Sequence, residues 1–187
     1  MVDLKELHKR FILEHLGVGE VAVDFTMGNG NDTLFLSKTV GDSGRVYAFD
    51  IQEAAINSTR ERLVAENAPE NYTLICASHD RVGEFVKEPI KAGMFNLGYL
   101  PGGEHGITTM RETTMAAVRA AIDLLLPDGV LIIAVYPGHE EGSLEGDMLR
   151  EYFKATSRFK ICPSEFRILN SPASPYFFVV EKSPRAK

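Results

Sequence analysis

The chain has 187 residues, of which 44% are hydrophobic, and a formal net charge of -6 at pH 7. This length predicts a single domain, residues 1–187, with a sizeable core. The acidic balance argues against an extended basic surface that binds nucleic acid tightly and without sequence preference, although it leaves room for a local basic patch. No segment approaches the roughly 20 uninterrupted apolar residues that span a bilayer, so we expect a soluble cytoplasmic protein with no membrane partner.

Cys76 and Cys162 are far apart, and neither belongs to a metal-type C-x-x-C motif. We expect both to be buried, reduced thiols. No set of histidines, cysteines and carboxylates has metal-ligand spacing, and the cluster at His139 is too sparse to form one, so we expect no metal.

Strand-like apolar runs alternate with helical patterns along most of the chain, and Gly and Pro mark the breaks between them. The predicted helices cover residues 4–16, 32–40, 53–67, 82–86, 108–126 and 144–156. The predicted strands cover residues 20–25, 45–49, 72–77, 93–97, 130–136, 159–169 and 176–180.

This alternation predicts an α/β fold with a doubly wound, mostly parallel sheet and helices on both of its faces. No helix separates the last two strands, which therefore predict a terminal antiparallel hairpin. In such a fold the ligand crevice lies beyond the carboxyl ends of the strands, so polar residues at those ends are the first candidates for function.

The stretch Val21–Thr33, V-A-V-D-F-T-M-G-N-G-N-D-T, ends an apolar run in Asp24 and continues into a two-glycine turn. Such a turn lets backbone amides approach a ligand closely. The third glycine of a dinucleotide-binding turn is absent, and a carboxylate beside the turn would repel a pyrophosphate. S-adenosylmethionine, which carries a sulfonium and an ammonium, fits better. The alternative for Asp24 is a residue that only caps the turn.

Asp50 ends the second apolar run, at the place where nucleotide-binding folds put the carboxylate that accepts hydrogen bonds from ribose. A surface turn aspartate is the alternative. At the end of the third predicted strand, Ser78 and His79 are candidate neighbours of the adenine. A helix cap made by Ser78 or Asp80 explains the same residues equally well.

The fourth predicted strand leads into F-N-L-G-Y-L-P-G-G, which places Asn96 and Tyr99 at a strand end beside glycines. This segment resembles the Asn-Pro-Pro-Tyr loop of methyltransferases that act on amino groups. There an asparagine and a backbone carbonyl accept hydrogen bonds from the amine, while an aromatic ring stacks on the substrate. A protonated amine has no free lone pair, so hydrogen-bond acceptors must hold the neutral amine in line with the methyl group. Much of the rate comes from this positioning of the amine. A turn asparagine and an ordinary loop aromatic are the alternatives.

After the fifth predicted strand, Y-P-G-H-E-E-G places His139 at the rim of the crevice. A histidine changes its charge near neutral pH, so His139 is a candidate to remove a proton from the product or to contact a phosphate. A solvent-exposed loop histidine is an equal alternative, and His105 has a weaker claim. The predicted catalytic residues are therefore Asn96, Tyr99 and His139.

Together, T-M-G-N-G-N-D-T-L-F-L, F-N-L-G-Y-L-P-G-G, I-T-T and Y-P-G-H-E-E-G resemble the small methyltransferase family labelled putative rRNA methylase, over nearly the whole chain. The resemblance implies a Rossmann-like class I methyltransferase domain with a seven-stranded sheet. It also implies use of S-adenosyl-L-methionine. Members of the family are implicated in converting 5-aminomethyl-2-thiouridine to its 5-methylaminomethyl form at the tRNA wobble position. The loop Asn170–Pro175 departs from the family in having fewer polar amides.

The motifs and the resemblance together give two sets of site residues. Predicted to bind the cofactor are Asp24, Thr26, Met27, Gly28, Gly30, Asn31, Asp50, Ile51, Gln52, Ser78, His79 and Asn96. Predicted to bind the substrate are Leu97, Gly98, Tyr99, Tyr136, Pro137 and His139.

The expected partner is a tRNA substrate, and a homodimer would widen the surface that holds it. Two alternatives remain open at this point. One is a methyltransferase for rRNA or for a small molecule, which the acidic balance favours somewhat. The other is an NAD-dependent oxidoreductase, because that class shares the glycine turn and the ribose carboxylate.

Overall fold

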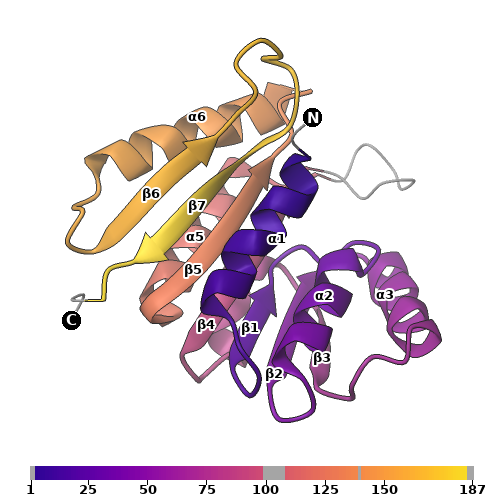
Figure 1. The fold of residues 1–187 in the computed structure, drawn as a ribbon. Coiled ribbons are helices and arrows are strands. Elements are labelled where there is room, and N and C mark those ends of the chain that lie inside the picture. The colour runs from indigo at the N-terminus through magenta and orange to yellow at the C-terminus, as the bar shows by residue number, and fades with distance from the viewer. Residues whose placement is uncertain (1–2, 99–107, 139, 185–187) are drawn as a thin grey trace.

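One seven-stranded sheet runs through the protein, with the strand order β3-β2-β1-β4-β5-β7-β6 (Figure 1). The computed structural model describes residues 3–98, 108–138 and 140–184. The strands are β1 (Val21–Asp24), β2 (Arg45–Asp50), β3 (Tyr72–Cys76), β4 (Ile90–Leu97), β5 (Leu125–Val135), β6 (Ile161–Phe166) and β7 (Tyr176–Lys182).

Strands β1 to β5 run parallel to one another, whereas β7 is antiparallel to both β5 and β6. The predicted mostly parallel sheet with a terminal antiparallel hairpin is therefore confirmed. The parallel strands are covered on both sides, which explains why β5 continues as an unbroken apolar run from Val130 to Val135.

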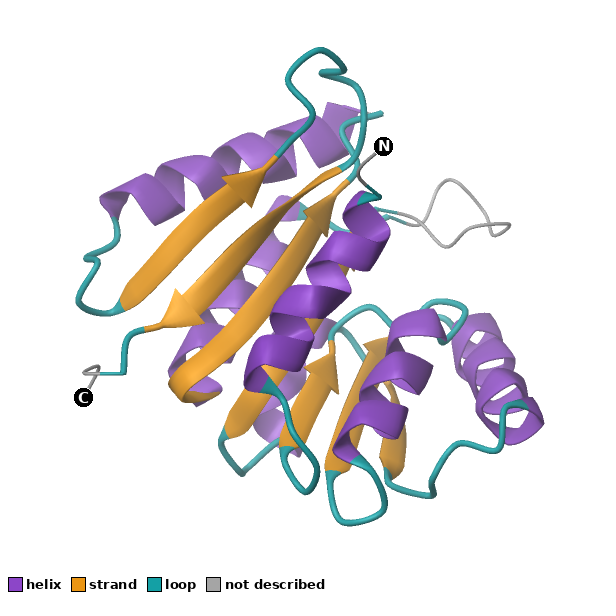
Figure 2. Cartoon of the chain, viewed as in Figure 1, coloured by secondary structure: helices purple, strands orange, loops and turns teal. Residues whose placement is uncertain are grey.

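Helices pack on both faces of the sheet, as predicted (Figure 2). One face is covered by α1, α2 and α3, and the other by α4, α5 and α6, because alternate residues of each strand point to opposite sides. The helices are α1 (Leu4–His15), α2 (Asn31–Val40), α3 (Glu53–Ala65), the 3-10 helix η1 (His79–Arg81), α4 (Val82–Phe85), α5 (Arg111–Leu124) and α6 (Glu140–Ala155).

The predicted boundary between α5 and β5 was wrong. The sequence placed a turn at residues 127–129 before the strand, but β5 begins at Leu125, directly after the helix. Ile90 pairs with Leu125 and Ala92 pairs with Val130, so the Pro-Asp-Gly segment bulges out of the ladder. The turn residues thus form a bulge within a strand, and the added pairing also starts β4 earlier than the predicted Gly93.

The C-terminal hairpin is shorter than predicted, because β6 pairs with β7 only over Ile161–Phe166. Phe159 and Leu169, which the sequence placed in this strand, are 83% and 92% exposed. Cys76 is also exposed, because it is the last residue of the edge strand β3, and Cys162 on β6 is only partly buried, so the predicted burial of both thiols was wrong. Among the described residues, no helix has the length and hydrophobicity that crossing a membrane requires.

Candidate active site

The carboxyl ends of β1, β2, β3, β4 and β5 meet along one edge of the sheet, because these strands are parallel and in register. Asp50 pairs with Cys76, and Leu97 pairs with Val135. The polar residues that the sequence placed at separate strand ends therefore lie along one rim. Tyr99, His105 and His139 lie outside the described residues.

Side chains of α3 form hydrogen bonds with the backbone of the glycine turn that follows β1. Gly28 and Gly30 have positive φ angles of 50° and 76°. Thr59 Oγ1 donates to the Gly28 carbonyl at 3.0 Å, and Arg62 Nε donates to the Asn29 carbonyl at 2.6 Å. Because these carbonyls face α3, the shape of the turn is fixed before any ligand binds.

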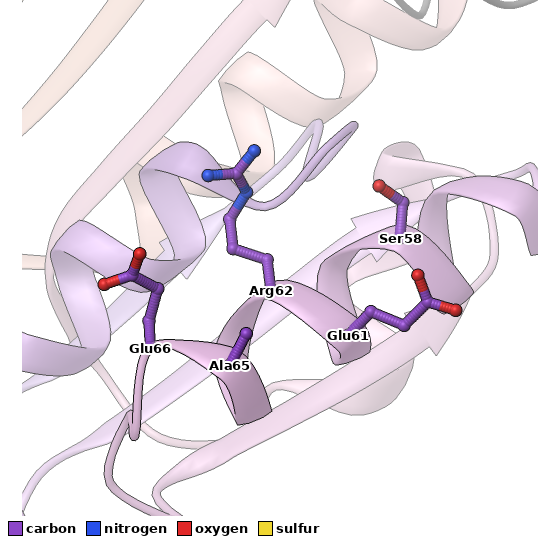
Figure 3. A pocket seen from close by; sticks show the side chains of 5 residues that line it. All are labelled: Ser58, Glu61, Arg62, Ala65 and Glu66. Atoms are coloured by element: carbon purple, nitrogen blue, oxygen red, sulfur yellow. The ribbon is translucent and has the colours of Figure 1, made fainter.

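Figure 3 shows the side chain of Arg62 beside a shallow hollow over α3. The hollow is lined by Ser58, Glu61, Arg62, Ala65 and Glu66, all from the end of this helix. Lys38 of α2 pairs with Glu66 at 3.3 Å. None of the predicted site residues lines this hollow, and two of its charged residues, Arg62 and Glu66, join α3 to the turn and to α2.

Replacing Gly30 by alanine is expected to destabilise the protein by about 2 kcal/mol, because a left-handed backbone costs a non-glycine residue roughly 1–2 kcal/mol. A Cβ at Gly30 would also lie 2.9 Å from the Cα of Thr59, so α3 and the turn would have to separate. Denaturant unfolding measures the loss. Gly83→Ala is the matched control, since a Cβ there meets nothing within 4 Å. Equal stability of the two variants would contradict the proposed fit.

Asp50 links the end of β2 to the glycine turn. Its Oδ2 accepts a hydrogen bond from the Gly28 amide at 3.1 Å, and its Oδ1 accepts one from the Gln52 amide at 3.0 Å. Burial raises the pKa of Asp50, and these backbone hydrogen bonds oppose the shift. Each carboxylate oxygen retains a lone pair for a further donor, as contact with a ribose diol requires. Ile51 beside it is 55% exposed and offers an apolar surface at the rim.

Asp24 is fully buried, and both of its oxygens are engaged by the turn itself. Oδ1 accepts from the Thr26 amide at 3.1 Å, and Oδ2 accepts from Thr33 Oγ1 at 2.6 Å. Desolvation, together with the nearby carboxylate of Asp32, raises the pKa of Asp24 to about 7. The capping role that the sequence left open for Asp24 is thus present, and direct contact with the cofactor stays a prediction.

The segment after β3 presents buried polar atoms where an adenine was predicted. His79 is 8% exposed, and its ring lies edge-on to Phe95 at a centroid distance of 6.0 Å. Burial lowers the pKa of His79. Among the described residues, Nε2 of His79 and Oδ1 of Asp80 have no hydrogen-bond partner. Ser78 makes no side-chain capping bond to η1. A buried acceptor such as Asp80 Oδ1 suits an exocyclic amino group.

Asn96 at the end of β4 is the predicted catalytic residue that lies within the described part of the chain. Its amide nitrogen Nδ2 donates to Asp32 Oδ2 at 2.6 Å, and Tyr136 donates its hydroxyl to Asn96 Oδ1 at 3.3 Å. Its backbone N–H donates to Thr26 Oγ1 at 2.7 Å. Because an ionised carboxylate only accepts hydrogen bonds, Asp32 sets which end of the amide carries the oxygen.

The remaining predicted site residues differ in how far their side chains are exposed at the rim. Met27 and Leu97 are 3% and 0% exposed, so their side chains belong to the core and only their backbone can meet a ligand. Asn31 is exposed, and Tyr136 and Pro137 are half-buried. Binding by Met27 and Leu97 therefore stays a prediction that concerns their backbone atoms.

Three important residues were missed. The sequence analysis included Asp32 only as the first residue of a predicted helix, although its acidic side chain within the glycine motif was a usable signal. Glu145 is fully buried and accepts hydrogen bonds from Thr109 Oγ1 at 2.8 Å and Thr114 Oγ1 at 2.6 Å. His8 lies on α1 with 6% exposure, and nothing in the helical pattern distinguished it from a core residue.

Thr109 also forms hydrogen bonds with the backbone of Gly98, two residues after Asn96. Its N–H donates to the Gly98 carbonyl at 3.0 Å, and the Gly98 N–H donates to Thr109 Oγ1 at 3.0 Å. Through Thr109, the buried carboxylate of Glu145 is connected to the end of β4. The position of Asn96 is therefore supported by α6 as well as by α2.

The strand order, the antiparallel β7 and this rim together define the class: the protein is a class I methyltransferase, a class that uses S-adenosylmethionine. The chain belongs to the family described as "Putative rRNA methylase", whose model matches residues 46–182. The NAD-dependent oxidoreductase that the sequence left open is not supported, because both the family and the hairpin differ from that class.

Solved structures agree with this assignment. A putative rRNA methylase from Clostridium thermocellum is 36% identical, with a TM-score of 0.94 over 97% of this chain and 98% of that chain. A putative methyltransferase from Streptococcus mutans in complex with SAH is also 36% identical, with a TM-score of 0.88 over 97% and 99% of the two chains.

Among curated proteins, the chain is 38% identical over 167 residues to a chloroplastic tRNA (mnm(5)s(2)U34)-methyltransferase from Arabidopsis thaliana. The match covers 84% of this chain and 61% of the relative. It is 26% identical to a ubiquinone/menaquinone biosynthesis C-methyltransferase from Azotobacter vinelandii, of which it covers 65%. The chain thus spans less than two thirds of the length of these curated relatives.

Proposed function

We propose that the protein is an N-methyltransferase for RNA that methylates the aminomethyl group of 5-aminomethyl-2-thiouridine at the tRNA wobble position. The product is the 5-methylaminomethyl nucleoside. The name of the Arabidopsis relative supports a tRNA substrate, and the family description supports RNA in general. The Asn96 amide carries the proposal, because its geometry suits an amine as the methyl acceptor.

The amide of Asn96 is oriented as recognition of an amine requires. Asp32 occupies its Nδ2, so Oδ1 is left as an acceptor beside the hydroxyl of Tyr136. An acceptor that binds an N–H of the neutral amine orients the amine, so that the nitrogen lone pair points at the methyl group. Because this acceptor is already fixed, its side chain loses no rotational freedom when the substrate binds. An apolar methyl acceptor, which has no N–H or O–H to donate, would not need this arrangement.

The residues along the rim fit S-adenosylmethionine. Asp50 would hold the ribose hydroxyls, the backbone of the glycine turn would lie against the cofactor, and Asp80 Oδ1 would accept from the adenine amino group. When bound, S-adenosylmethionine supplies an electrophilic methyl group on a sulfonium. The observation that supports this fit is the buried Asp80 oxygen, which lacks a partner among the described residues and costs free energy unless a donor binds to it.

The proposed reaction is balanced without a metal or a covalent enzyme intermediate. The amine lone pair forms a bond to the methyl carbon, the carbon–sulfur bond breaks, and its electron pair goes to sulfur. The substrate enters as an ammonium and leaves as a methylated ammonium, so one proton is released in each turnover. The amine must therefore be neutral when it attacks the methyl group.

Incubation with labelled S-adenosylmethionine and tRNA that carries the unmethylated aminomethyl group is expected to label the wobble nucleoside. Nucleoside mass spectrometry identifies the product. The same tRNA without the aminomethyl group is the control and should stay unlabelled. Labelling of rRNA or of free nucleosides in place of tRNA would reject the tRNA substrate. Label that appears on a carbon or oxygen atom would reject the amine.

A further inference from the structure

We propose that Thr109 and the buried Glu145 are positioning residues for the methyl transfer, which hold the end of β4 and thereby keep Asn96 in line with the methyl group. This inference rests on the proposed function and deepens it. It assigns control of the reaction rate to a carboxylate on α6, a helix that contains none of the predicted site residues.

Both backbone groups of Gly98 are bound by a single residue. The Gly98 N–H donates to Thr109 Oγ1 at 3.0 Å, and the Gly98 carbonyl accepts from the Thr109 N–H at 3.0 Å. Gly98 has a φ of 147°, a conformation that favours glycine. Because a peptide unit is planar, the bond to the Gly98 N–H fixes the orientation of the whole peptide that joins Leu97 to Gly98. The backbone that follows Asn96 is therefore held by Thr109.

The hydroxyl of Thr109 is itself oriented by Glu145. A hydroxyl has one proton to donate. Thr109 donates this proton to Glu145 Oε2 at 2.8 Å, so that an oxygen lone pair is left for the Gly98 N–H. Without the carboxylate, the hydroxyl would be free to rotate away from Gly98. Glu145 therefore determines how firmly Thr109 binds the end of β4.

Glu145 is held in place by the start of α5. It is fully buried, and its second oxygen, Oε1, accepts from Thr114 Oγ1 at 2.6 Å. One turn earlier on the same side of α6, Glu141 Oε1 accepts from the backbone N–H and from Nε of Arg111, at 3.1 Å and 3.0 Å. Both carboxylates thus bind the first turn of α5, which leaves Glu145 little freedom to move.

The helix α6 also packs directly on the strand ends at the rim. A Cβ at Gly146 would collide with the hydroxyl of Tyr176 and would lie 3.1 Å from Cγ1 of Val135. Val135 pairs with Leu97 of β4 on one side and with Tyr176 of β7 on the other. The helix that carries Glu145 is therefore fixed against the sheet at the level of Leu97, one residue before Gly98.

The alternative is that this network only stabilises the fold, because a buried carboxylate that loses a hydrogen-bond donor destabilises any protein. Two hydroxyls separate the alternatives. Thr109 and Thr114 each donate one hydrogen bond to Glu145, but in the described part of the chain only Thr109 also binds the end of β4. The same substitution at the two positions is therefore a matched comparison.

The test compares Thr109→Val with Thr114→Val in single-turnover reactions with the aminomethyl tRNA and saturating S-adenosylmethionine. Thr109→Val is expected to slow methyl transfer about 10-fold, a part of the roughly 10²-fold that a misplacement of about 1 Å can cost. Thr109→Ser keeps the hydroxyl and should recover most of the rate. Thr114→Val should keep the wild-type rate, since Glu145 still accepts from Thr109.

Rates are expressed per molecule that binds S-adenosylhomocysteine, so that a loss of folded protein does not lower them. The affinity for S-adenosylhomocysteine and the KM for tRNA should stay close to the wild-type values in Thr109→Val, because a positioning residue acts on the transfer step. Equal rates for Thr109→Val and Thr114→Val, whether reduced or unchanged, would overturn the inference.

Glu145→Met tests the carboxylate, because methionine has a similar length but no carboxylate oxygen to accept from the two hydroxyls. It should slow methyl transfer as Thr109→Val does. The double variant with Thr109→Val should be no slower than the slower single variant, since both changes act on the same contact. Losses that add in full would overturn the role of Glu145.

A second measurement does not depend on activity. The Gly98 amide should exchange its hydrogen slowly in the wild type and in Thr114→Val, and at least about 10-fold faster in Thr109→Val, because its acceptor is lost. Unchanged exchange of Gly98 in Thr109→Val, followed by NMR, would overturn the inference. If the wild type does not label the tRNA at all, the proposed function fails, and the exchange of Gly98 still decides whether Thr109 holds the end of β4.

Discussion

Asn96→Ala is expected to lower kcat on the aminomethyl tRNA by about 10²-fold, in the range found when one positioned hydrogen-bonding group is removed from an active site. The affinity for S-adenosylhomocysteine should change little, because the contacts of Asp50 and of the glycine turn do not depend on this side chain. Single-turnover kinetics measure the methyl transfer, and calorimetry measures the binding of S-adenosylhomocysteine.

The physical reason is the fixed orientation of the amide. Asp32 and Tyr136 hold the two ends of the Asn96 side chain, and alanine removes the acceptor while leaving the Asp32 carboxylate in place. Asn57→Ala, on the exposed surface of α3, is the matched control and should retain full activity. If Asn96→Ala weakens the binding of S-adenosylhomocysteine and leaves kcat unchanged, Asn96 contacts the cofactor and has no role in holding the amine.

Asp50→Ala is expected to weaken the binding of S-adenosylhomocysteine by about 10²-fold, since hydrogen bonds to a charged group contribute roughly 1.5–3 kcal/mol. The substitution also leaves the Gly28 and Gln52 amides without their acceptor. The glycine turn should therefore lose its connection to the end of β2, and the melting temperature of the unliganded protein should fall. Calorimetry and thermal unfolding measure the two effects.

Asp42→Ala serves as the control for Asp50→Ala, because Asp42 is an exposed aspartate in the turn before β2. It should leave both the affinity and the melting temperature close to those of the wild type. Unchanged affinity in Asp50→Ala would remove the ribose role that we assign to this carboxylate. In that case Asp50 would act only as a support for the turn.

Sequence patterns predicted the architecture because each strand and helix carries its own periodic signal. The alternation and the hairpin that replaces a final helix predicted a mostly parallel sheet with an antiparallel end, whereas the seven-strand arrangement came from the family resemblance. The boundary at β5 could not be predicted in this way. Pro127 and Gly129 are turn residues in any local reading, and only the pairing of Ile90 with Leu125 makes that segment part of a strand.

The site was predictable where a polar residue interrupts an apolar run, as Asp50 and Asn96 do. It was not predictable where function depends on contacts between distant segments. Asp32 and Asn96 are far apart in sequence, and the buried His8 belongs to a third segment, α1. A buried histidine on an amphipathic helix gives the same pattern as a core residue, so the sequence had no means to single it out.

The contacts between α3 and the glycine turn determine which property of the enzyme substitutions on α3 should alter. Thr59 and Arg62 set the shape of the cofactor loop, yet neither belongs to the part of the rim where the methyl acceptor is recognised. Substitutions along α3 should therefore tune donor affinity and product inhibition while the choice of acceptor stays the same. Thr26 and Asp32 of the same segment, by contrast, bind Asn96 directly, so changes there should affect both the donor and the acceptor.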